Sequence, residues 1–142
     1  MPDDILAGRR VLVVEDEYFL ADELDHALRA SGATVAGPVS TVEAALALLA
    51  DFVLPDLATV DVNLGGEMAY PVADALVAHG VPFLFTTGYD QASLPHRYAS
   101  APRMEKPFDT RKVLQELGRL HTERAAARSH RPPTHSPSGS VP

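Results

Sequence analysis

The sequence predicts an α/β domain built on a doubly wound parallel sheet. Five short β-type runs alternate with stretches of helical periodicity along the chain. This alternation is the usual sign of a parallel sheet with helices on both faces. The 142 residues are enough for one core and too few for two ordinary domains. We therefore expect a single five-stranded domain.

Each predicted strand is a short apolar or β-branched run. The five runs are about Arg10–Glu15, Thr34–Ala36, Leu57–Asp61, Pro82–Thr86 and Arg103–Glu105. The fourth run is the most continuously apolar of the five, so we expect it to be a central strand that is buried on both faces.

Helical patterns fill most of the intervals between these runs. Leu20, Leu24 and Leu28 recur at spacings of four after the first strand, and Gly32 is placed to end that helix. The segment 40–49 begins with Ser-Thr-Val-Glu, which is a capping box for a second helix.

Two further helices are predicted in the second half of the chain. One runs from about Ala69 to His79, because Pro71 lies near its start and Gly80 at its end. The last helix can be capped by Asp109, and its buried side is formed by Val113, Leu114, Leu117 and Leu120.

Two parts of the chain depart from this regular pattern. Between Thr87 and Arg103 the run Ser93-Leu94-Pro95 interrupts any helix, so we expect a fourth helix that is short or mobile. The residues after about Arg128 are rich in proline, serine and histidine, which predicts disorder. The expected organisation is an N-terminal extension (1–8), one domain (9–121), and the end of the last helix with a disordered tail (122–142).

Composition narrows the classes of function. The net charge of −7 argues against direct binding to nucleic acid, whose affinity comes mainly from cationic side chains on phosphates. The apolar stretches are shorter than a membrane span, and the acidic start does not resemble a signal peptide. The chain has no cysteine, which excludes a disulfide framework and a thiol nucleophile. We expect a cytoplasmic protein without membrane insertion.

Three acidic residues and a lysine each follow or close an apolar run. Glu15 and Asp16 close the first run, Asp61 closes the third, and Lys106 follows the fifth. The carboxyl ends of parallel strands open on one crevice, so these four side chains should meet. Carboxylates brought together repel one another unless a cation lies among them. The pattern therefore predicts a divalent metal site in which the lysine neutralises a further anion.

Each of these residues also has a simpler explanation when taken alone. Asp61 could be a turn or cap residue, and Glu15-Asp16 could be favoured by the start of a helix. The combination is harder to explain in this way, because a hydroxyl pair follows the fourth strand and a lysine-proline pair follows the fifth. A haloacid-dehalogenase-like phosphatase would need an aspartate where Asn63 stands, and no G-x-G-x-x-G or P-loop motif is present.

With these motifs in order, the chain resembles a receiver domain of two-component signalling from about Arg10 to Leu120. Val13-Val14-Glu15-Asp16-Glu17 is similar to the acidic motif of that family, and Asp61 to its phospho-accepting aspartate. Thr87-Gly88 and Lys106-Pro107-Phe108 are similar to its remaining two motifs. The resemblance implies a flavodoxin-like sheet with strand order 2-1-3-4-5.

The resemblance also implies a role for each residue of the site. Asp61 would become an aspartyl phosphate. Lys106 would pair with the carboxylate or with the incoming phosphoryl group, and the Thr87 hydroxyl would donate to a phosphoryl oxygen. Mg²⁺ would be held by Asp16, Asp61 and the backbone carbonyl of Asn63, with Glu15 reaching it directly or through water. Gly88 would leave room for the phosphoryl donor.

The run Phe83–Asp90 and the following Leu94-Pro95 resemble the FAT-GUY subfamily of receivers from alphaproteobacteria. That likeness implies a histidine kinase of the HWE or a related type as partner. Standard receivers carry an aromatic switch residue three positions before the lysine, where this chain has Arg103. We therefore expect coupling to rely on Thr87 and the segment after it, with Tyr89 placed to slow hydrolysis by obstruction.

The function implied is that of a stand-alone response regulator. It would accept a phosphoryl group from a sensor histidine kinase or a histidine phosphotransfer protein, and would signal through protein contacts or act as a phosphate shuttle or sink. It would not be an enzyme beyond its own Mg²⁺-dependent phosphoryl transfer and autodephosphorylation. The alternative is a receiver-like binding adaptor that is not phosphorylated.

Overall fold

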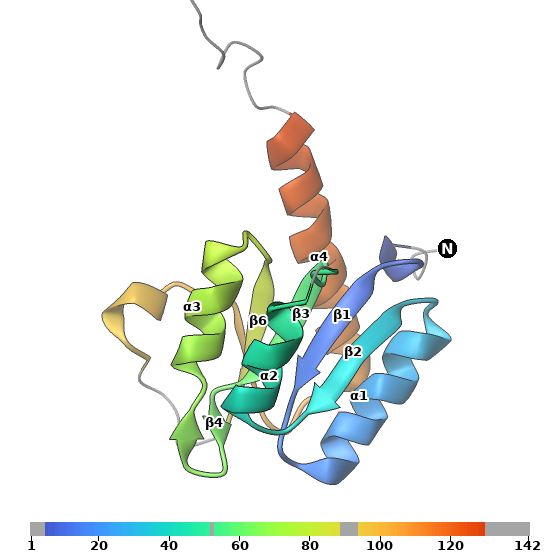
Figure 1. The fold of residues 1–142 in the computed structure, drawn as a ribbon. Coiled ribbons are helices and arrows are strands. Elements are labelled where there is room, and N and C mark those ends of the chain that lie inside the picture. The colour runs from blue at the N-terminus through green and yellow to red at the C-terminus, as the bar shows by residue number, and fades with distance from the viewer. Residues whose placement is uncertain (1–4, 52, 89–93, 130–142) are drawn as a thin grey trace, which may run out of the picture.

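The computed structural model describes residues 5–51, 53–88 and 94–129 of the chain. Its main sheet is parallel and contains β1 (Arg10–Val14), β2 (Thr34–Val39), β3 (Leu57–Asp61), β6 (Phe83–Thr87) and β7 (Arg103–Glu105). The strands lie in the order β2-β1-β3-β6-β7, so the predicted order 2-1-3-4-5 is confirmed (Figure 1). The expected disorder of the tail concerns residues 130–142, which lie outside the described residues.

Helices cover both faces of this sheet. They are α1 (Tyr18–Ala30), α2 (Val42–Leu49), α3 (Tyr70–Ala78) and α4 (Thr110–Ser129). One core cluster joins the sheet to α2 and α3, and a second joins the opposite face to α1 and α4. Figure 1 shows α2 and α3 in front of the strands and α4 behind them, with the end of α4 extending past the sheet. None of the helices among the described residues combines the length and apolar character needed to cross a membrane.

Capping contacts fix the starts of two helices. The Thr41 hydroxyl accepts the backbone N–H of Ala44 at 3.1 Å, so the N-cap of α2 is Thr41 and the helix starts one residue later than the predicted Ser-Thr-Val-Glu capping box requires. The Asp109 carboxylate accepts the N–H of Arg111 at 2.9 Å, at the start of α4. Two of the four apolar residues predicted to be buried on α4, Val113 and Leu117, have no exposed surface. The other two, Leu114 and Leu120, are only partly buried.

Strand β2 is longer than predicted, because it continues through Gly37 and Pro38. A proline cannot donate to a neighbouring strand, but β2 lies at the edge of the sheet, where this is tolerated. Gly37 has φ +89°, and a Cβ at this position would lie 2.7 Å from the backbone nitrogen of Val39 and 3.1 Å from the carbonyl oxygen of Val13. The glycine therefore permits a close approach of β2 to β1 that no other residue would allow.

A second departure follows β3, in a region where no further strand was predicted. Residues 63–68 form a small antiparallel hairpin of β4 (Asn63–Leu64) and β5 (Glu67–Met68). Its turn residues are Gly65 and Gly66, both at positive φ, as a two-residue hairpin turn requires. The Asn63 side chain accepts the Gly66 N–H at 2.6 Å and fixes this turn beside the end of β3.

The chain between β6 and β7 contains a 3₁₀ helix, His96–Tyr98, where a full helix was not expected. This 3₁₀ helix agrees with the prediction that a fourth helix in this region would be short. Asp74 on α3 accepts two hydrogen bonds from Arg97, both at 3.0 Å, and one from the Tyr98 hydroxyl. The Tyr98 ring is buried against Tyr70, Phe83 and Phe85. The 3₁₀ helix is thus attached to α3 and to the core at the same time.

Candidate functional site

The predicted site residues meet at the carboxyl edge of the main sheet. Glu15 directly follows β1, Asp61 ends β3, Thr87 ends β6, and Lys106 directly follows β7. These four strands are consecutive neighbours in the sheet. Because parallel neighbours end on the same side, residues separated by up to 91 positions come into hydrogen-bonding contact.

The ammonium group of Lys106 is the centre of the cluster. Its Nζ donates to Glu15 Oε2 at 3.0 Å, to Asp61 Oδ2 at 2.9 Å and to Glu17 Oε2 at 2.9 Å. Glu15 is 3% exposed and Asp61 is 4% exposed, so two of the three carboxylates are buried. Charge-assisted contacts of this kind are among the stronger hydrogen bonds in proteins.

Backbone groups fix the two buried carboxylates. Glu15 Oε2 also accepts the N–H of Glu17 at 3.1 Å, and Asp61 Oδ1 accepts the N–H of Asn63 at 3.1 Å. Asp61 therefore presents one oxygen to the loop that follows it and the other to Lys106. The second oxygen of Glu15, Oε1, is buried and has no hydrogen-bond partner among the residues that the structure describes.

The electrostatics of the site reflect an excess of negative charge. Burial and the neighbouring Asp61 raise the pKa of Glu15 to about 8. Burial and Asp61 also raise the pKa of Asp16. Burial alone would lower the pKa of Lys106, but its hydrogen bonds to the three carboxylates outweigh this and raise that pKa above its ordinary value. One lysine does not neutralise four carboxylates, so the site favours an additional cation.

The donor set fits Mg²⁺. Glu15, Asp16 and Asp61 offer carboxylate oxygens that lie within 4.8 Å of one another. The unpartnered Oε1 of Glu15 is a buried acceptor that a cation could satisfy. Mg²⁺ prefers oxygen ligands and keeps several waters, so a few protein oxygens suffice, and the exposed Asp16 leaves the site open to water. The backbone carbonyl of Asn63 stays a prediction as a further ligand.

Thr87 ends β6, the strand next to β7, and Lys106 directly follows β7. It is 4% exposed, and its backbone carbonyl accepts the N–H of Lys106 at 2.8 Å, which ties the end of β6 to the residue after β7. Gly88 follows it and is half-buried. The role of the Thr87 hydroxyl stays a prediction, and Tyr89, the proposed shield, lies outside the described residues.

Arg103, three positions before Lys106, caps the 3₁₀ helix. Its Nη2 donates to the carbonyl oxygen of Ala99 at 2.7 Å and to that of Tyr98 at 3.4 Å. The side chain is exposed on the edge strand β7. An aromatic side chain is nevertheless buried in this region, because Tyr98 reaches the core from the 3₁₀ helix.

Sequence reasoning missed Glu17. It belongs to the acidic run Glu15-Asp16-Glu17, but its contact with Lys106, 89 positions away, depends on how far the start of α1 lies from β7. The presence of a third acidic residue in the run was the available signal.

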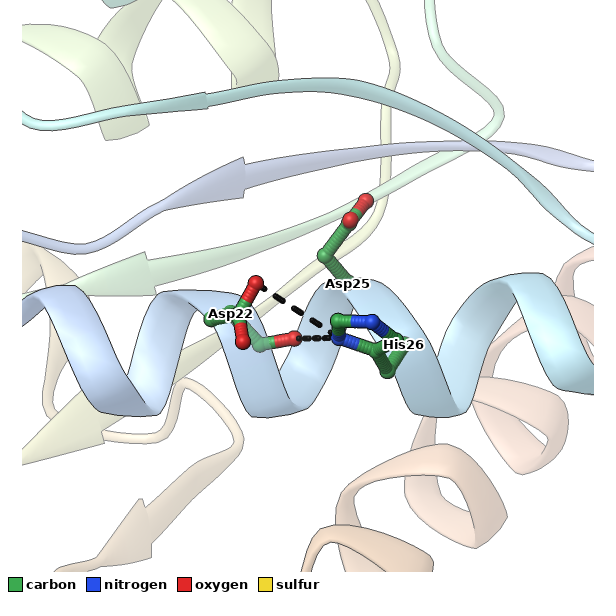
Figure 2. Close-up of side chains that lie close together, drawn as sticks. All are labelled: Asp22, Asp25 and His26. Atoms are coloured by element: carbon green, nitrogen blue, oxygen red, sulfur yellow. Dashed lines mark hydrogen bonds and ion pairs between the residues drawn. The ribbon is translucent and has the colours of Figure 1, made fainter.

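A second group of possible metal ligands lies on α1 and does not join the site. Figure 2 shows Asp22, Asp25 and His26, whose ligand atoms lie within 4.8 Å of one another. His26 Nδ1 lies 2.9 Å from the carbonyl oxygen of Asp22, whereas Asp25 accepts a hydrogen bond from Arg29 at 2.8 Å. These are surface contacts between neighbouring turns of one helix.

Comparison with known proteins agrees with this geometry. No protein-family model matches the chain. LytT of Bacillus subtilis (strain 168), a sensory transduction protein, is 34% identical over 112 residues, which are 76% of this chain. The chain spans only 46% of the length of LytT.

Solved structures extend the comparison. SdrG from Sphingomonas melonis Fr1 is 40% identical, with a TM-score of 0.69 over 82% of this chain and 97% of SdrG. A CheY-like response regulator receiver domain from Methanospirillum hungatei JF-1 shares the fold at 23% identity, with a TM-score of 0.73 over 85% of this chain and 99% of that domain. With its strand order and its cluster of carboxylates around Lys106, the chain belongs to the response regulator receiver domains.

Proposed function

We propose that the chain is a phospho-accepting response regulator in which Asp61 receives the phosphoryl group. The observation that carries this proposal is the position of Asp61, a nearly buried carboxylate held 2.9 Å from Lys106 beside the carboxylates of Glu15 and Asp16. Phosphoryl transfer depends mainly on positioning and on stabilising the charge of the phosphoryl oxygens. Asp61 is the candidate for the positioned nucleophile, and Lys106 is the candidate for stabilising the charge.

The proposed reaction uses the residues as follows. An oxygen of Asp61 attacks the phosphorus atom, and the bond from phosphorus to the donor breaks as the donor leaves with its electron pair. Lys106 donates to a phosphoryl oxygen, and the Thr87 hydroxyl donates to another. Mg²⁺, when bound by Glu15, Asp16 and Asp61, supplies positive charge to the same oxygens. We propose a histidine kinase or a histidine phosphotransfer protein as the donor, which would place the protein in the cytoplasm.

The output of the protein is also a proposal. We propose that the protein acts through protein contacts that change on phosphorylation, or that it carries phosphate within a relay. The binding of Mg²⁺, the specific HWE-type kinase and the FAT-GUY subfamily remain predictions from sequence.

Intact mass after incubation with acetyl phosphate and Mg²⁺ tests the proposal. We expect one added phosphoryl group in the wild type, and none after chelation or in Asp61→Asn. The matched control is Asp51→Asn, the same change at an exposed aspartate outside the site, which should accept phosphate normally. If Asp61→Asn is still phosphorylated, the assignment is wrong. If the wild type gains no mass, the alternative of a binding adaptor is favoured.

A further inference from the structure

The hydrogen-bonding capacity of Lys106 is fully used. An ammonium group has three N–H donors, and those of Lys106 are taken by Glu15, Glu17 and Asp61. Lys106 can donate to an incoming phosphoryl oxygen only after it gives up one of these contacts. The structure indicates which contact that is.

The free energy lost when Lys106 leaves a carboxylate differs among the three carboxylates. The side chain of Glu15 is 1% exposed and that of Asp61 is 5% exposed, whereas that of Glu17 is 61% exposed. A buried carboxylate that loses its donor has no water to replace it, which is costly. An exposed carboxylate is solvated again at once, so an ion pair at the surface contributes little.

The backbone of Glu17 is fixed while its side chain is accessible. Glu17 is the N-cap residue of α1, and its carbonyl accepts the N–H of Ala21 at 2.9 Å. Its own N–H donates to Glu15 Oε2 at 3.1 Å. Release of Lys106 therefore needs only a rotation of the Glu17 side chain into solvent, without any movement of the helix.

We propose that Glu17 is a positioning residue that holds Lys106 before the transfer and is displaced from it by the phosphoryl group. The inference rests on the proposed function of Asp61. As the bond from Asp61 to phosphorus forms and the bond from phosphorus to acetate breaks, acetate leaves with the electron pair. The Lys106 N–H that pointed to Glu17 then points to a phosphoryl oxygen. No proton is transferred in this exchange.

Displacement predicts that Glu17 competes with the phosphoryl group for Lys106. Glu17→Gln removes the competing charge and leaves Lys106 held by Glu15 and Asp61. The apparent affinity for a phosphoryl group or its mimic should then rise by about 1.5- to 5-fold, which is the contribution of an exposed ion pair expressed as a ratio. The matched control is Glu23→Gln, the same change at an exposed glutamate of α1 that does not contact Lys106.

The experiment measures two quantities for the wild type and both variants. One is the dependence of the phosphorylation rate on acetyl phosphate concentration. The other is the apparent dissociation constant of trifluoroberyllate with Mg²⁺, followed by amide NMR shifts. We expect Glu17→Gln to bind trifluoroberyllate more tightly and to reach half its maximal rate at less acetyl phosphate. Glu23→Gln should match the wild type, and the melting temperatures should agree.

The outcomes separate the two proposals. If the wild type is phosphorylated but Glu17→Gln binds the mimic no more tightly than Glu23→Gln, the exchange at Glu17 is refuted. An equal gain in both variants also refutes it, because it would reflect overall charge and not the contact with Lys106. If the wild type accepts no phosphoryl group on Asp61, the proposed function itself fails.

Discussion

Replacing Lys106 with methionine should destabilise the protein far more than an ordinary surface substitution. Lys106→Met replaces the lysine with an uncharged side chain of similar length and leaves Glu15 and Asp61 buried without their cation. Removing one partner of a buried ion pair typically costs about 3–5 kcal/mol. We expect the lower end, about 3 kcal/mol, because Glu15, whose pKa is already raised to about 8, can take up a proton. For a chain of this length such a loss lowers the melting temperature by roughly 10 °C.

The assay is thermal and urea unfolding in the presence of a chelator and again with Mg²⁺. The chain has two lysines, and Lys112, which is exposed on α4, provides the matched control. Lys112→Met should change the free energy of unfolding by less than about 0.5 kcal/mol. Mg²⁺ should restore part of the stability of Lys106→Met, because it supplies positive charge to the same carboxylates. Equal stability of the two variants in chelator would refute the reasoning.

Three further outcomes are expected. Burial and the hydrogen bond to Asp74 raise the pKa of Tyr98 to about 12, so the folded state favours the protonated phenol and loses that stabilisation as the pH rises from the ordinary value toward 12. An absorbance titration of Tyr98→Phe should therefore lack a late-ionising component that Tyr18→Phe, a change at an exposed tyrosine, retains. Gly37→Ala should cost about 2 kcal/mol or more, as measured by urea unfolding, because its Cβ would clash with the backbone; Gly66→Ala has the same kind of φ but open space and should cost less. Mg²⁺ should raise the melting temperature of the wild type and should do so much less in Asp16→Asn, and an equal rise in both would remove Asp16 from the metal site.

The arrangement of the strands could be predicted because local pattern and topology agree. The apolar run of β6 is buried at all five positions, as its composition indicated. Once the strands are parallel, the ends of β1, β3, β6 and β7 must open on one edge. The meeting of Glu15, Asp61 and Lys106 follows from that geometry alone.

What the sequence did not reveal depended on contacts between distant segments. The extension of β2 through Pro38 is tolerated because β2 is an edge strand of the sheet that the described residues form, which local sequence does not show. The hairpin after Asp61 is an exception, because its Gly65-Gly66 turn and the contact from the Gly66 N–H to Asn63 are local in sequence. The contact of Glu17 with Lys106 requires the relative position of α1 and β7, which no short-range pattern encodes.

The brevity of β7 gives Lys106 a mechanical role. This strand has three residues and, within the described parts of the chain, pairs with β6 alone, so few backbone hydrogen bonds hold it to the sheet. If β7 separated from β6, Lys106 would move with it and would leave two buried carboxylates without their ion-pair partner. The lysine therefore stabilises the attachment of this edge strand to the sheet. A cation bound among the carboxylates would weaken the ion pairs of Lys106, and a phosphoryl group on Asp61 would give Lys106 a new partner. Amide hydrogen exchange in β7 should therefore report the charge carried by the site.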